Sequence, residues 1–227
     1  MTKIIRIKLS FSNAYLIQGR KTILVDSGSQ HEGLKILRAL AGLGIEPKDF
    51  SLILHTHAHF DHAGSTRELK NWINVPTAVH QADADMLARG SMNRLTPVNL
   101  EGRLLLPIIN RPFPALKADL VIKDEISLKE FGVDGRIIFT PGHTAGSLSV
   151  LLNNGEAVIG DLMMGGVMGG NLRPSRPGYH YYAEDLSEIR ASIKKIMACK
   201  PRKLHVGHGG PLDAAAVKEY FAKDIQF

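Results

Sequence analysis

Residues 54–64 read Leu-His-Thr-His-Ala-His-Phe-Asp-His-Ala-Gly and place four histidines and one aspartate within eight positions. Imidazole nitrogens and carboxylate oxygens are ligands that zinc takes in proteins. Because residues two apart at a strand end point the same way, we expect His57 and His59 to face one ion. Asp61 continues this alternation, and His62, where the chain turns toward a helix, can serve a second ion together with Asp61. The spacing therefore predicts a site for metal ions.

Three later positions carry further candidate ligands: His143 in Pro-Gly-His-Thr, Asp161 in Gly-Asp and His208 in Gly-His-Gly. Each follows an apolar stretch typical of a strand, and each directly follows a glycine, which permits close approach of the backbone. A catalytic zinc ion usually takes three protein ligands and keeps one position open for water. Since the first segment alone does not saturate two ions, we expect these side chains to complete the site. His205 is a competing donor, but the glycines on both sides of His208 favour His208.

The order of these motifs, H-x-H-x-D-H, P-G-H-T, G-D and G-H-G, resembles the metal-binding motifs of the metallo-β-lactamase superfamily from residue 57 to residue 208. Asp26, in Leu-Val-Asp-Ser-Gly, is similar to the family's early strand-end aspartate. The resemblance implies an α/β fold, the αββα four-layer sandwich, with the site at one sheet edge. It also implies the ligands: His57, His59 and His143 for the first metal, Asp61, His62 and His208 for the second, and Asp161 as a bridge together with a hydroxide.

Two divalent cations at such a site would lower the pKa of a bound water from ~15.7 toward ~7 and so supply a hydroxide nucleophile at neutral pH. They would also polarise the scissile carbonyl or phosphoryl oxygen. We expect two zinc ions, with iron or manganese as alternatives, and we expect Asp61 to be catalytic as well as a ligand. The leading hypothesis is a hydrolase of a small ester, thioester, lactone or related substrate.

Other activities use the same ligand types. A mononuclear-iron oxidoreductase similar to the persulfide dioxygenases is one alternative, because these donors suit iron as well as zinc. Phosphodiesterase or β-lactamase activity on the same scaffold is another. A binding module without catalysis is disfavoured, since all the family's ligand positions are matched.

Residues near the expected site would choose the substrate. Some lactonases of the superfamily place a tyrosine from the region after the bridging aspartate near the substrate oxygen, which makes Tyr179, Tyr181 and Tyr182 candidates here. Met164 lies in a stretch rich in Gly and Met and could line an adaptable apolar pocket. We expect the loops at about 90–118 and 162–182 to set specificity.

The elements that must position these residues follow from the apolar pattern. Short, mainly apolar runs bounded by turn residues predict strands at 4–9, 14–18 and 22–25, and leucines at helical spacing predict a helix over 34–43 before a strand at 50–54. A strand, helix, strand order implies a partly parallel sheet. Further predictions are strands at 75–79, 120–122, 136–140, 148–152, 157–159 and 203–206, helices at 81–88, 183–199 and 213–222, and irregular structure at 90–118 and after Asp161.

Composition favours one soluble domain over residues 1–227. Apolar residues make up 44% and charged residues 22%, and the chain has no run of about 18 apolar residues that would predict a membrane span. The single cysteine excludes an internal disulfide and, without a visible secretion signal, indicates the cytoplasm. The net charge of +6 is dispersed and aromatics are only 6%, so we expect a small-molecule substrate and no nucleic acid. A homo-oligomer stays possible on this sequence.

Overall fold

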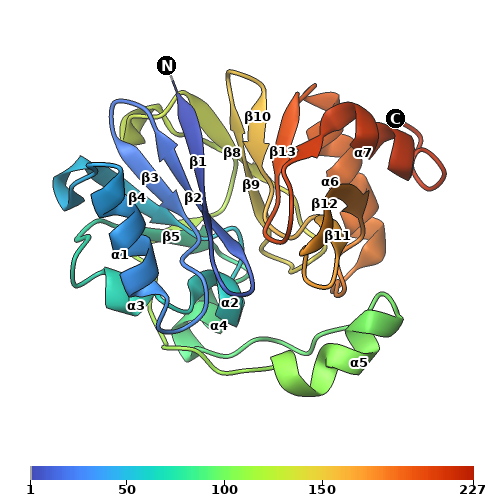
Figure 1. The fold of residues 1–227 in the computed structure, drawn as a ribbon, viewed down its shortest axis with the longest axis horizontal. Coiled ribbons are helices and arrows are strands. Elements are labelled where there is room, and N and C mark those ends of the chain that lie inside the picture. The colour runs from blue at the N-terminus through green and yellow to red at the C-terminus, as the bar shows by residue number, and fades with distance from the viewer. Residues whose placement is uncertain (1) are drawn as a thin grey trace.

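A computed structural model describes residues 2–227, in which two six-stranded sheets lie between helical layers (Figure 1). The first sheet contains β1 (Lys3–Lys8), β2 (Asn13–Gln18), β3 (Thr22–Val25), β4 (Phe50–Leu54), β5 (Thr77–His80) and β6 (Leu120–Ile122), paired in chain order. Strands β1 to β3 pair antiparallel, and β3 to β6 pair parallel. Between β3 and β4 the chain passes through α1 (Gly33–Gly42) and η1 (Pro47–Asp49). The partly parallel sheet expected from the strand, helix, strand pattern is thus present.

The second sheet has the strand order β14, β13, β10, β9, β8, β7. Its strands are β7 (Ile126–Ser127), β8 (Gly135–Phe139), β9 (Leu148–Leu152), β10 (Glu156–Val158), β13 (Lys203–His205) and β14 (Leu212–Asp213), with η2 (Lys129–Phe131) between β7 and β8. Within it, β10 and β13 pair parallel across a connection that contains α6 (Leu186–Ala198), and α7 (Ala214–Phe221) follows β14.

The core is arranged in three apolar layers. Between the sheets, residues such as Tyr15 and Val25 pack with Val150 and Val158 of the second sheet. On the outer face of the first sheet, α1 packs against Leu16, Leu24 and Ile53 through Ile36 and Leu40. On the outer face of the second sheet, Ile189, Ile193 and Ile196 of α6 pack with Ile159 and Leu204. Burial on both faces explains why β2 and β9 consist mainly of apolar residues. The predicted αββα sandwich is confirmed.

Two segments differ from the sequence-based expectation of irregular structure. Residues 90–118 contain α5 (Leu100–Ile109), in which the Asn99 side chain accepts a hydrogen bond from the Gly102 amide at 2.8 Å. This cap satisfies one of the free amides of the first turn, and the helix extends through Pro107. After Asp161, β11 (Met164–Val167) and β12 (Leu172–Gly178) form an antiparallel hairpin. Its glycines and prolines lower strand propensity and so concealed the hairpin.

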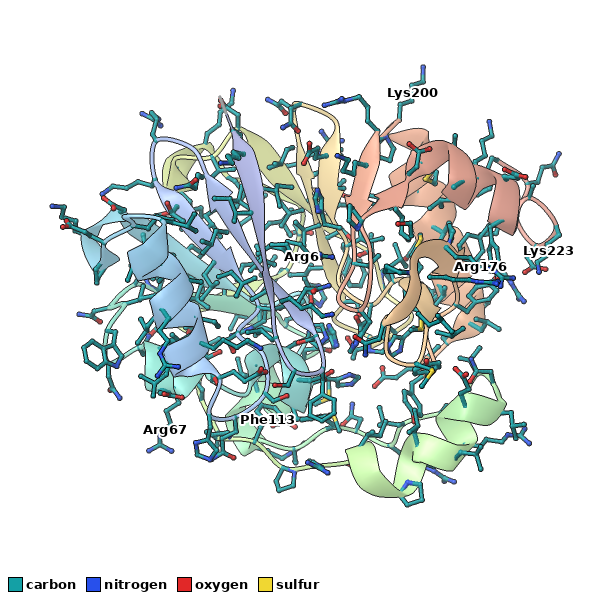
Figure 2. The ribbon with its side chains drawn as sticks, viewed as in Figure 1. Arg6, Arg67, Phe113, Arg176, Lys200 and Lys223 are labelled. Carbon is teal, nitrogen blue, oxygen red and sulfur yellow. The ribbon has the colours of Figure 1, made fainter. Side chains whose placement is uncertain are left out.

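Shorter helices complete the first half of the chain: α2 (Phe60–Ala63), α3 (Thr66–Leu69) and α4 (Ala84–Arg89). Among residues 2–227, no helix combines the length and the apolar content that crossing a bilayer requires. Figure 2 shows basic side chains at separate places on the molecule: Arg67 lies on α3, Arg176 on β12, and Lys200 and Lys223 follow α6 and α7.

Candidate metal centre

The first group of predicted ligands lies just beyond the carboxyl end of β4. The strand ends at Leu54, so His57 and His59 belong to the loop that follows it, and Asp61 and His62 lie in α2. All four side chains are buried. The Nδ1 atom of His59 lies 3.1 Å from Nε2 of His143, which belongs to the second sheet's edge. His59 and His143 therefore approach each other as expected for ligands of one ion. His59 lies on the loop after β4 and not on the strand itself.

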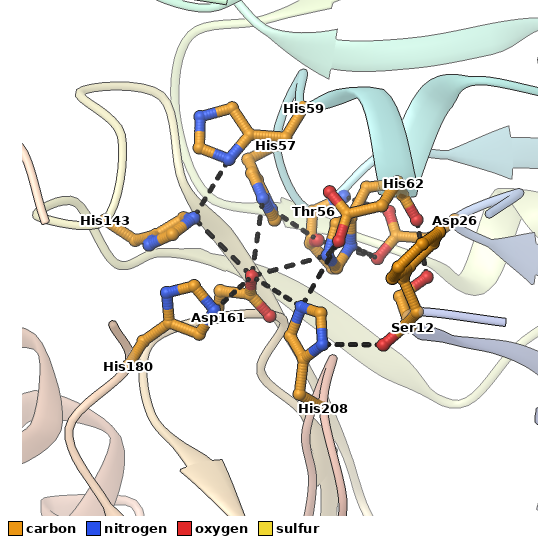
Figure 3. Close-up of polar contacts among 12 residues, drawn as sticks. Ser12, Asp26, Thr56, His57, His59, His62, His143, Asp161, His180 and His208 are labelled. Carbon is orange, nitrogen blue, oxygen red and sulfur yellow. Dashed lines mark hydrogen bonds and ion pairs between the residues drawn. The ribbon is translucent and has the colours of Figure 1, made fainter. Parts of the chain in front are cut away.

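The second sheet brings its three candidates to the same edge. His143 follows β8, Asp161 follows β10 and His208 follows β13. Asp161 lies at the middle, with Oδ2 3.2 Å from Nε2 of His208, 3.4 Å from Nε2 of His62 and 3.5 Å from Nε2 of His143 (Figure 3). The structure therefore gathers all seven side chains that the sequence singled out as metal ligands.

Within the part of the chain that the structure describes, four overlapping groups of three donors could each hold a metal ion. They are His57, His59 and His143; His57, His62 and Asp161; Asp61, His62 and His208; and His143, Asp161 and His180. The first and third groups have the same members as the two sets that the family resemblance implies. The donor atoms within each group lie within 4.8 Å of one another.

The chemistry of these donors fits divalent cations. Ligand atoms ~2.1 Å from a tetrahedral ion lie roughly 3.4 Å apart, and the Asp161 contacts to His62, His143 and His208 range from 3.2 to 3.5 Å. Nε2 of His57, Nε2 of His62 and Oδ1 of Asp161 are buried and have no hydrogen-bond partner. A buried polar atom without a partner costs about 1–3 kcal/mol. A bound cation would remove that cost.

Hydrogen bonds at the outer nitrogens orient three of the imidazoles. Nδ1 of His143 lies 2.9 Å from the Tyr182 carbonyl, and Nδ1 of His208 lies 2.8 Å from the Phe11 carbonyl. A carbonyl oxygen only accepts, so both Nδ1 atoms donate, and in the neutral form of each ring Nε2 keeps a lone pair for a metal ion. His62 is held in the same way by Asp26, at 2.8 Å.

The charges in the centre divide the histidines into two classes. Burial and the neighbouring imidazoles lower the pKa of His57 and of His59 well below the usual value. Burial also disfavours the charged form of His208, but the carboxylates of Asp161 and Asp61 outweigh burial and raise its pKa to about 10. The centre thus holds neutral imidazoles on the His59 side, which is the form that binds metal.

Two polar residues at the site carry no motif that would have identified them. Asp83, at the start of α4, accepts hydrogen bonds from the Ala58 amide at 3.0 Å and from Thr144 Oγ1 at 2.8 Å. It thereby connects the first ligand loop to the loop that carries His143. Burial raises the pKa of Asp83 to about 6, although its hydrogen bonds from Thr144 and Ala58 act in the opposite direction.

His180 is the second residue that the motifs missed. Its Nε2 lies 3.3 Å from Oδ2 of Asp161, and its ring centroid lies 4.6 Å from that of His143. The signal that could have found it is its place inside Tyr-His-Tyr-Tyr, where the sequence directed attention to the tyrosines. His205, the competitor of His208, instead lies 3.0 Å from Glu156 and belongs to none of the four donor groups.

The expected substrate-binding residues pack in two apolar clusters. Tyr182 is buried, and its hydroxyl donates to the Gly102 carbonyl at 2.8 Å. The Tyr181 hydroxyl accepts from the Gly169 amide at 3.0 Å, and Met164 packs in the same apolar cluster as both tyrosines. Tyr179 packs on Phe221 of α7. A role for these four side chains in substrate binding stays a prediction.

Comparison with known proteins agrees with this architecture. A solved metallo-β-lactamase, BLEG-1 of subclass B3, superposes with a TM-score of 0.70 at 22% identity over 96% of this chain and 97% of that one. A second structure, TTHA1623 in a di-iron-bound form, gives a TM-score of 0.68 at 23% identity over 98% of this chain and 99% of that one. At these identities the two likenesses show the fold.

Sequence similarity extends the agreement to the family. A probable metallo-hydrolase of Methanocaldococcus jannaschii is 31% identical over 204 residues, which cover 87% of each chain. The sequence profile of the metallo-beta-lactamase superfamily matches residues 7–208, the span that contains every predicted ligand. The chain therefore belongs to the metallo-β-lactamase superfamily.

Proposed function

We propose that this chain is a two-metal hydrolase that acts on a small ester, thioester, lactone or related carbonyl compound. The observation that carries the proposal is the pair of three-donor groups, His57 with His59 and His143, and Asp61 with His62 and His208, joined through the buried Asp161. We take zinc as the first candidate metal, and iron or manganese as alternatives, because the same nitrogen and oxygen donors suit all three.

Two bound cations would supply a hydroxide nucleophile at neutral pH and would stabilise the negative charge that develops on the substrate oxygen. The remaining work falls to side chains of this protein. Asp61 is suited to orient the attacking water: burial disfavours its ionised form, but the charges of His62 and His208 outweigh burial and hold its pKa below the usual range. An ionised carboxylate accepts hydrogen bonds and so directs a water lone pair at the substrate.

The segments that flank the centre would select the substrate. The Val98 amide donates to the Tyr181 carbonyl at 2.8 Å, and Pro97 forms a bridge with Tyr182. These contacts tie the start of the segment that contains α5 to the residues beside His180. Because this segment and the β11–β12 hairpin lie beside the centre but carry none of the seven expected ligands, we propose that they shape the space for the acyl and leaving groups.

We also infer that residues 2–227 act as one domain, because the two sheets share one central core. The single cysteine, Cys199, agrees with a cytoplasmic site of action. The dispersed basic residues and low aromatic content support a small-molecule substrate.

The test combines metal analysis with a hydrolysis screen. Protein loaded with zinc, iron or manganese is assayed on lactone, thioester, phosphodiester and β-lactam substrates, with chelated protein and Asp161→Asn as controls. We expect close to two metal equivalents per chain and chelator-sensitive hydrolysis of a carbonyl substrate. Hydrolysis that persists in chelated protein would contradict the proposal. One iron per chain with oxygen consumption on a persulfide would favour the oxidoreductase alternative instead.

A further inference from the structure

His180 faces the metal centre but is not one of the seven matched ligands. It lies between β12 and α6, and its side chain is buried. Its ring centroid lies 4.6 Å from that of His143 and 5.1 Å from that of His208, which are one histidine from each of the two donor sets (Figure 3). Its Nε2 points at Oδ2 of Asp161, 3.3 Å away. The side chain therefore reaches the place where both sets meet.

The backbone around His180 determines which ring nitrogen carries the proton. The Tyr182 amide donates to Nδ1 of His180 at 3.3 Å. The Tyr182 carbonyl is 3.4 Å from the same Nδ1, but it already accepts the shorter, 2.9 Å bond from His143. Because a buried backbone amide needs an acceptor, Nδ1 of His180 accepts. In the neutral ring the proton then lies on Nε2, which makes Nε2 a donor without a free lone pair.

We propose that His180 donates a hydrogen bond from Nε2 to the substrate oxygen that becomes negatively charged during hydrolysis, and that it is not a metal ligand. This inference rests on the proposed function and names a further catalytic residue for it. In the structure, Oδ2 of Asp161 lies 3.3 Å from this Nε2. A developing oxyanion is a stronger acceptor than a carboxylate oxygen shared among several partners, so the bond strengthens as the reaction proceeds.

The hydrolytic step balances without proton transfer from His180. A hydroxide oxygen forms a bond to the carbonyl carbon, and the carbonyl π pair moves onto the carbonyl oxygen, which His180 stabilises. The pair then returns, the bond to the alkoxide or thiolate leaving group breaks, and that group takes a proton from water. His180 keeps its own proton throughout. It therefore acts by charge stabilisation alone.

The test compares two substitutions with opposite donor capacity. His180→Phe keeps a planar ring and removes the donor, whereas His180→Gln places an amide N–H near the position of Nε2. His205→Gln is the matched control, because His205 is a buried histidine that pairs with Glu156 and lies outside the donor groups. For each variant we measure kcat, KM and the number of metal equivalents bound. Chelator competition gives the metal affinity, and the visible spectrum of the cobalt-loaded protein reports the ligand set.

We expect His180→Phe to bind metal as the unsubstituted protein does, with an unchanged cobalt spectrum and a KM within about threefold. Its kcat should fall on the order of 100-fold, the loss typical of one oxyanion donor, and His180→Gln should recover at least about tenfold of that loss. Loss of a metal equivalent or an altered spectrum in His180→Phe would overturn the proposal in favour of a ligand role. An unchanged kcat would overturn it as well.

A measurement without turnover separates this inference from the proposed function. Inorganic phosphate, a tetrahedral oxyanion, is titrated into the cobalt-loaded proteins, and we expect about tenfold weaker binding to His180→Phe than to His205→Gln. If the unsubstituted protein binds metal but hydrolyses no substrate in the screen, the proposed function fails, and the phosphate result still decides the donor role. Equal phosphate affinity in all variants would contradict that role.

Discussion

Nδ1 of His62 lies 2.8 Å from Oδ2 of Asp26, and both side chains are buried. The same carboxylate accepts from the Thr56 amide at 2.8 Å and from the Thr56 hydroxyl at 2.7 Å. Asp26 follows β3, Thr56 follows β4 and His62 lies in α2. One carboxylate thus connects three chain segments and turns Nε2 of His62 toward Asp161.

Replacing Asp26 with Asn is expected to weaken metal binding by 10–100-fold, the usual cost of losing a carboxylate partner of a metal-binding histidine. Asp26 has a φ of 60°, a conformation that Asn adopts more readily than most residues, so the backbone should be retained. Chelator competition measures the affinity. The exposed Asp134, replaced in the same way, is the control, and equal affinity in both variants would show that Asp26 does not orient His62.

Gly207 is not expected to tolerate a larger residue, because Asp161 and His62 leave no room for a side chain there. A Cβ at Gly207 would lie 2.0 Å from Oδ1 of Asp161 and 2.7 Å from Cε1 of His62. Gly207→Ala should therefore displace a donor and lower the metal content to one equivalent or less, as measured by elemental analysis of the purified protein. Gly42→Ala, whose Cβ would have no neighbour within 4 Å, should keep full metal content. Full content in both variants would contradict the crowding argument.

Asp83 should make the stability of the metal-free protein depend on pH. Its pKa is raised from 3.8 to about 6 in the folded chain, mainly by burial. A raised folded pKa means that the contribution of Asp83 is present below pH 4 and is lost as the pH rises through 6. Between pH 4 and pH 7 the unfolding free energy should therefore fall by about 2 kcal/mol more in the unsubstituted protein than in Asp83→Asn.

Urea unfolding of both proteins at several pH values tests this expectation. The comparison with Asp83→Asn isolates the Asp83 contribution, because other titrating groups are common to both proteins. If the two free-energy profiles run parallel from pH 4 to pH 7, Asp83 titrates at its ordinary pKa and the burial argument fails.

Metal removal should lower thermal stability. A ligand that binds only the folded state and is present at about 1,000 times its Kd adds roughly 4 kcal/mol of stability, which for a chain of this size is a Tm increase on the order of 10 °C. Differential scanning calorimetry with and without chelator measures the shift. Asp161→Asn should show a much smaller shift, because Asp161 takes part in two of the four donor groups. A full-size shift in this variant would place the metal elsewhere.

Local sequence patterns predicted most of the fold because apolar periodicity reports burial directly. Strand β3 at Thr22–Val25 and strand β9 at Leu148–Leu152 were predicted with the bounds that the structure has. The predictions were wrong where local signals compete. Pro107 argued against α5, and the stretch rich in Gly and Met after Asp161 argued against the β11–β12 hairpin. Contacts distant in sequence, such as the bridge between Pro97 and Tyr182, are made by these segments and leave no local trace.

The sequence alone determined which residue types were present at which spacing, and this was enough to predict the seven side chains from His57 to His208 that converge. Ligand motifs are visible because metal chemistry restricts the residue types and the adjacent glycines. Only the tertiary structure decided that Asp83 connects two loops and that His180 faces Asp161. The reason is physical: an isolated Asp or His is chemically ambiguous until folding fixes which atoms lie within hydrogen-bond distance and which of them are shielded from water.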